Sequence, residues 1–151
     1  MAAPDISNMS PRERTDRLFN RVMSAAERGD TGEVRFFVPM ALQSYALLGP
    51  LDTDARYHLG VIQFVNHNYV AALAEADSMA REIPGHLLAS ALRAQIAVAR
   101  GDATARRRAY REFLAAYDRE MAAGRSEYAE HAGILQATRD SARSARSAGT
   151  R

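Results

Sequence analysis

Apolar side chains recur every three or four residues along most of this chain, which is the spacing of one face of an α-helix. The first run carries Phe19, Val22 and Ala26, and it follows Ser10 and Pro11, an N-cap with proline at the first helical position. Breaks rich in Gly, Pro, Asn and Asp separate successive runs. Together they predict about seven helices, over residues of about 11–28, 31–48, 53–65, 69–81, 86–100, 103–123 and 126–143.

The fold class and the chain ends follow from the same pattern. No segment alternates apolar and polar residues like a half-buried strand, so the sequence predicts an all-α protein, with short turns that favour antiparallel hairpins. Pro39 lies inside the second run, where proline clashes with the preceding turn, so we expect a kink near residues 35–38 or a split into two helices. Residues 1–10 and 144–151 have few apolar anchors, and we expect both ends to be flexible.

A weak internal period runs through the predicted hairpins. Pro50 and Pro84 lie 34 residues apart, and so do the turns at His67 and Gly101. A fixed period of this length is typical of helical-repeat proteins, in which each repeat is a pair of helices.

Four residues stand at fixed places inside that period: Leu59, the small Gly60 and Ala72, and the helix-ending Pro84. At these offsets the chain resembles the tetratricopeptide repeat, whose signature of about 34 residues reads W-x2-L-G-x2-Y, then A-x3-F, then P. Three positions depart from it: Arg56 replaces the tryptophan, Gln63 the tyrosine and Ala76 the phenylalanine. The resemblance is therefore to a divergent member of that family.

The resemblance implies a short α-solenoid over residues 11–140. Three antiparallel hairpins would span about 11–50, 51–84 and 85–123, and a C-terminal capping helix would span about 126–143. The first repeat is longer than the second by roughly four residues, about one helical turn, and the extra turn coincides with Pro39.

The resemblance also implies a non-enzymatic protein–protein interaction module, a scaffold or adaptor that binds an apolar peptide or helix in a concave groove. The first helix of each pair would line that groove with Phe19, Met23, Tyr57, Val61, Phe64, Leu88 and Gln95. Alternatively, these side chains are core residues beneath the last helix. Acidic Asp16, Glu27 and Asp54 share the groove positions, and lysine is absent, which argues against capture of a peptide's terminal carboxylate.

Composition and charge leave a second function open. The chain has 151 residues, enough for one domain, and no cysteine, which excludes disulfides. All 20 basic residues are arginine, typical of a GC-rich genome, and we expect a bacterial source. With a net charge of only +2, nucleic-acid binding requires a local patch, for which the candidate is Arg106, Arg107 and Arg111 beside Tyr110.

Candidate chemistry is sparse in the sequence. The four histidines are scattered, and although Glu127 and His131 lie one helical turn apart, we assign no catalytic residue, metal site or cofactor. No apolar run is long enough to cross a bilayer, and the N-terminus does not resemble a leader. We expect a cytoplasmic protein, with a soluble extracytoplasmic domain of an anchored protein as the alternative. Its partner would be a protein or peptide, a second copy of the chain, or a larger complex.

Overall fold

The structure, a computed structural model, describes residues 5–149, and this part of the chain is all helical. Its helices are α1 (Pro11–Glu27), α2 (Thr31–Leu47), α3 (Thr53–Val65), α4 (Tyr69–Glu82), α5 (Leu87–Arg100), α6 (Ala103–Ala122), α7 (Ser126–Glu130) and α8 (Ala132–Ala148). The prediction of an all-α protein is confirmed.

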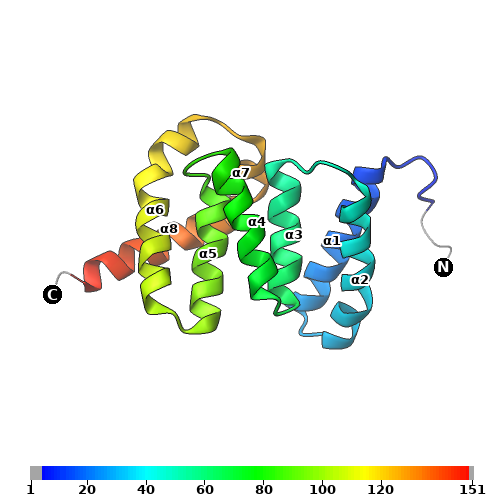
Figure 1. The fold of residues 1–151 in the computed structure, drawn as a ribbon, viewed down its shortest axis with the longest axis horizontal. Helices are drawn as coiled ribbons and strands as arrows, with labels where there is room; N and C mark the ends of the chain where they lie inside the picture. Colours follow the sequence, from blue (N-terminus) through cyan, green and yellow to red (C-terminus); the bar gives the residue numbers. More distant parts are fainter. Residues whose placement is uncertain (1–4, 150–151) are drawn as a thin grey trace.

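The first six helices form three hairpins that stand side by side (Figure 1). Helix α1 packs against α2, α3 against α4 and α5 against α6, while α3 also contacts α1 and α5 of the neighbouring hairpins. Helix α8 runs obliquely across the third hairpin and packs on α5 and α6 (Figure 1). The short α7 lies before it and connects it to the end of α6.

Local capping explains why the helices begin where they do. At α1 the backbone N–H of Glu13 donates to the hydroxyl of the predicted N-cap Ser10, and the backbone N–H of Ser10 donates to the Glu13 carboxylate, which together form a capping box. Four further helices start with an Asp or Asn side chain that accepts a backbone N–H three residues on: Asp30, Asp52, Asn68 and Asp102.

Of the two alternatives expected at Pro39, the split is wrong: helix α2 continues from Thr31 to Leu47. Because Pro39 and Arg35 are both exposed, water can hydrate the Arg35 carbonyl that loses its helical partner.

The predicted last helix is in fact two helices, because the backbone at His131 (φ −112°, ψ 27°) interrupts it. The first of them, α7, begins at Ser126 and has Arg125 as its N-cap residue. Helix α8 then continues to Ala148, so most of the tail expected to be flexible at 144–151 is helical. Residues 1–4 and 150–151, which belong to the expected flexible ends, lie outside the described residues.

Small residues allow the middle hairpin to approach its neighbours closely. A Cβ at Gly60 would lie 2.6 Å from Cδ2 of Leu92 on α5 and 3.3 Å from Cβ of Glu75 on α4. Ala72, the other small position of the repeat signature, is fully buried. In the described part of the chain, no helix combines the length and apolar character needed to span a bilayer.

Replacing Gly60 with alanine should lower the free energy of unfolding by about 1–3 kcal/mol, because the buried Leu92 has little room to move. The matched control is Gly133→Ala in α8, where an added Cβ meets no atom within 4 Å. Helix propensity predicts that this control is neutral or stabilising by up to about 1 kcal/mol. Urea denaturation followed by circular dichroism measures both. A Gly60→Ala variant as stable as the wild type would show that close helix approach is not required there.

Candidate functional site

A cluster of charged side chains lies where α1 meets the first turn of α3. The guanidinium of Arg12 contacts three carboxylates: Nε lies 3.0 Å from Asp16, Nη1 lies 3.2 Å from Asp52, and Nη2 lies 2.6 Å from Oδ2 of Asp54. One cation thus faces three anions, and the cluster keeps a surplus of negative charge.

His58 lies one helical turn after Asp54 on α3 and is buried. Its ring stacks on Phe19 with 4.0 Å between the ring centroids, and its Nδ1 lies 3.3 Å from Oδ1 of Asp16. Burial lowers the pKa of His58 and outweighs the opposing effect of the nearby carboxylates Asp54 and Asp16, which favours the neutral imidazole.

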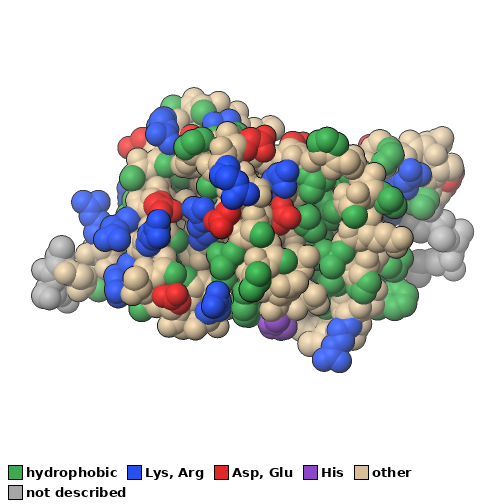
Figure 2. All heavy atoms as spheres, in the orientation of Figure 1, with side chains coloured by type: hydrophobic (Ala, Val, Ile, Leu, Met, Phe, Trp, Pro, Cys, Tyr) green, Lys and Arg blue, Asp and Glu red, His purple; other side chains and the backbone are tan. Residues whose placement is uncertain are grey.

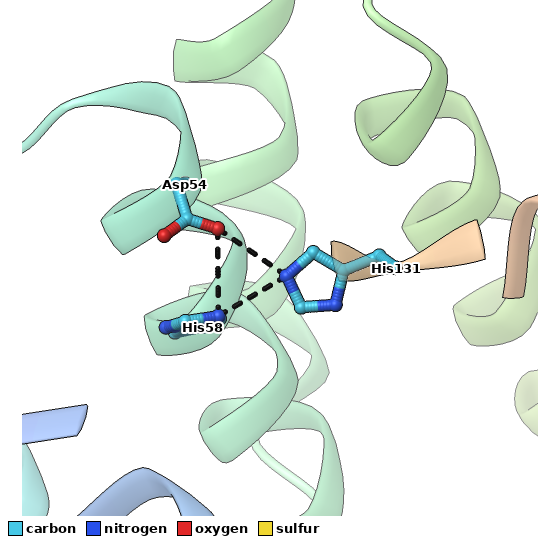
Figure 3. A group of neighbouring side chains, drawn as sticks. All are labelled: Asp54, His58 and His131. Carbon is cyan, nitrogen blue, oxygen red and sulfur yellow. Dashed lines mark hydrogen bonds and ion pairs between the residues drawn. The ribbon is translucent and has the colours of Figure 1, made fainter. Parts of the chain in front are cut away.

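His131 comes from the break between α7 and α8 and faces the same point (Figure 3). Its Nε2 lies 3.2 Å from Oδ1 of Asp54 and 3.1 Å from Nε2 of His58, and its ring meets the ring of Tyr57 edge-on at 4.7 Å. Burial raises the pKa of Asp54, but the hydrogen bond from His131 and the charges of His58 and Arg12 outweigh burial and lower it overall. Asp54 is therefore an anion facing two imidazoles.

A second polar network holds α7 in place. The carboxylate of Glu127 accepts a hydrogen bond from the Thr53 hydroxyl at 2.9 Å and pairs with Nε2 of the fully buried His86 at 3.0 Å. The Tyr128 hydroxyl accepts the backbone N–H of Leu87 at 2.9 Å and donates to buried Glu120 at 2.8 Å. These bonds tie α7 to the starts of α3 and α5 and so position His131.

The cluster of Asp54, His58 and His131 was not predicted from the sequence. Glu127 lies one helical turn from His131, but its side chain turns to His86 instead. The available signal was the spacing of Asp54 and His58, one helical turn apart. Nothing local places His131 beside them, because more than seventy residues separate it from either partner.

The predicted groove residues are largely enclosed. Phe19, Tyr57 and Val61 are buried, and Leu88 is fully buried and offers no surface to a partner in this conformation. The other three, Met23, Phe64 and Gln95, are partly exposed. Phe64 and Gln95 share a hollow of about 300 Å³ with Ile134 and Thr138 of α8, so the last helix covers part of this face.

The predicted arginine cluster is only partly assembled. Arg107 and Arg111 are exposed and line a hollow of about 340 Å³ between α6 and α8, together with Tyr110 and Arg146. Arg106 does not line that hollow, and its Nε is buried without a hydrogen-bond partner among the described residues.

An exposed apolar stripe on α2 was not predicted. Phe36, Met40 and Leu47 are 67%, 46% and 79% exposed, and their spacing of four and seven residues places them on one side of the helix. Figure 2 shows apolar side chains gathering over the α2 and α3 half of this face, whereas charged side chains gather over α4 to α6. These three residues form the α2 stripe.

Comparison of the chain with family models, with curated proteins and with solved structures gives no match. The likeness to tetratricopeptide repeats therefore depends on the residues of the 51–84 segment and on the hairpin order alone.

The buried His86 should make stability depend on pH. Burial lowers the pKa of His86 and outweighs the hydrogen bond to Glu127, while nearby Arg125 lowers and Glu120 raises it. The unfolded chain therefore takes up this proton first, and the stability that His86 contributes is lost as pH falls below about 6.5. Between about pH 7.5 and pH 5, the free energy of unfolding should decline less steeply in His86→Gln than in the wild type.

Urea titrations at several pH values measure this slope. His67→Asn is the control, because His67 is exposed and asparagine tolerates its positive φ of 60°. The control should keep the wild-type slope. A His86→Gln variant with an unchanged slope would contradict the assignment.

Proposed function

We propose that this protein is a divergent tetratricopeptide-like α-solenoid and works as a non-enzymatic module that binds another protein. The observation that carries the proposal is the α2 stripe, at the outer end of the row of hairpins. Solenoids normally end in a polar outer face, because an exposed apolar end invites association. An unpaired apolar face on the terminal hairpin favours a partner that packs against it.

The form of the surface favours an amphipathic helix as the bound element. The stripe presents three flexible or aromatic anchors over about three helical turns, which is the length of contact that a helix laid against a surface requires.

The α2 stripe is a different surface from the groove that the sequence predicts on the first helix of each hairpin. Tyr57, Val61 and Leu88 are buried in the core, whereas Phe64 and Gln95 line an open hollow on the side of the first helices. We propose the α2 stripe as the main contact and that hollow as a secondary one.

The α2 stripe is tested by charge substitution in the full chain. Phe36→Asp with Leu47→Asp should abolish capture of the partner from the source organism and weaken direct binding at least about 100-fold, because each buried apolar anchor contributes about 1.5–3 kcal/mol. The charge-matched control is Val70→Asp with Met121→Asp, two exposed apolar residues on α4 and α6 that lie outside both proposed contacts.

Binding is measured by isothermal titration with the purified partner, after circular dichroism has shown that both variants fold. Equal loss in the two double variants would refute the α2 stripe as the binding surface. Concentration-dependent dimerisation of the wild type in light scattering, lost only in the Phe36 and Leu47 variant, would identify the partner as a second copy.

A second candidate function is nucleic-acid binding at the hollow between α6 and α8. Arg107, Arg111 and Arg146 surround it, and Tyr110 offers an aromatic face for a base. This grouping brings together three guanidinium groups from two helices, α6 and α8, whereas the predicted cluster lay on α6 alone.

Single-stranded RNA binding over a salt series tests this candidate. In Arg107→Gln with Arg111→Gln, the slope of log affinity against log salt should become shallower by about 1–2, one contribution for each lost phosphate contact. Arg14→Gln with Arg17→Gln on α1 removes the same charge elsewhere and should leave the slope unchanged. Absence of wild-type binding at low salt, or equal effects of both double variants, would exclude the site.

A further inference from the structure

Three atoms of metal-ligand type converge from two distant parts of the chain. Nε2 of His58, Nε2 of His131 and Oδ1 of Asp54 form a triangle with sides of 3.1 Å between the two nitrogens, and 3.2 Å and 3.5 Å from the oxygen to His131 and to His58 (Figure 3). Asp54 and His58 come from α3, and His131 comes from the break before α8.

The size of the triangle matches one face of a zinc coordination sphere. With metal–ligand bonds of about 2.0–2.1 Å, neighbouring ligands of a tetrahedral Zn²⁺ lie about 3.3–3.4 Å apart. The three observed distances bracket that value. Three ligands on one face leave a fourth position for water or an external ligand.

Geometry makes a cation more suitable here than hydrogen bonding alone. Nδ1 of His58 faces the carboxylate of Asp16, which leaves Nε2 of His58 facing Oδ1 of Asp54 and Nε2 of His131. Nε2 of His131 can carry only one hydrogen, which cannot point at both Nε2 of His58 and Oδ1 of Asp54. A metal ion satisfies all three atoms at once.

The surroundings supply the support that a metal site needs. Asp16 orients the His58 ring through Nδ1, which is the usual carboxylate–histidine–metal arrangement. Arg12 holds the other oxygen of Asp54 at 2.6 Å, which leaves Oδ1 directed at the histidines. With Asp52 included, three carboxylates face one guanidinium, so the net charge favours a cation.

We propose that Asp54, His58 and His131 bind a Zn²⁺ ion that fastens the junction of α7 and α8 to α3. Two imidazole nitrogens with one carboxylate oxygen select first-row transition ions over Mg²⁺ or Ca²⁺, which prefer all-oxygen sites. The ion closes the chain between residues more than seventy positions apart and holds the C-terminal helices against the hairpins.

The test uses the full chain without a histidine tag, stripped of metal by a chelator. Titration with Zn²⁺ should show one site per chain. Titration with Co²⁺ should give the visible absorption of a four-coordinate ion, which Zn²⁺ then displaces. At about a hundredfold excess over the dissociation constant, Zn²⁺ should raise the thermal midpoint by about 5–10 °C.

His131→Asn and Asp54→Asn should each weaken Zn²⁺ binding at least about tenfold and abolish the thermal shift, while His67→Asn should behave as the wild type. Asparagine suits position 131, because that residue precedes α8 as its N-cap.

Hydrogen exchange should show that Zn²⁺ slows exchange in α7 and α8 of the wild type only. No wild-type Zn²⁺ binding, or binding unchanged in both site variants, would overturn the proposal. If either variant fails to fold, the Co²⁺ spectrum of the wild type decides, since it distinguishes nitrogen and oxygen ligation in a four-coordinate site from adventitious hydrated metal.

Discussion

The structure depends on one constraint: ionisable groups removed from water must be paired. At the base of α3, Asp54 and His58 lose most of their hydration, and among the described residues Arg12, Asp16 and His131 pair with them. These partners come from two segments remote from α3 in sequence, namely α1 and the break before α8. Burial of the carboxylate and the imidazole is therefore possible only when α1, α3 and the C-terminal segment are assembled together.

The same constraint explains the course of the chain after α6. Buried Glu120 binds Arg125 at 2.8 Å and accepts the Tyr128 hydroxyl, while Glu127 turns inward to His86. The bonds of Glu127 to Thr53 and His86, and of Tyr128 to the Leu87 N–H, place α7 across the starts of α3 and α5. The break at His131 follows, because a single straight helix could not satisfy both the α7 network and the packing of α8 on α5 and α6.

Some parts of this structure could be predicted from the sequence and others could not. Helix positions were predictable because capping residues and helical periodicity act within a few residues, as at Ser10 and Asp52. The sequence did not show whether Pro39 splits α2, since that depends on whether the freed carbonyl reaches water, and α2 is unsplit. The site at His131 was not predictable, because its partners are remote in sequence and each histidine alone looks like an ordinary polar residue. The groove residues were recognised as apolar, but periodicity does not show which apolar face another helix covers.

The sequence alone determined the helical class, the hairpin order and the spacing that brings Gly60 and Ala72 to close helix contacts, because these features follow from local geometry and side-chain size. Only the tertiary structure decided which apolar residues are buried and which, as on α2, remain exposed. It also decided that His131 meets Asp54 and His58. The physical reason is that burial and electrostatic pairing depend on neighbours across the whole molecule, whereas helix formation depends on neighbours along the chain.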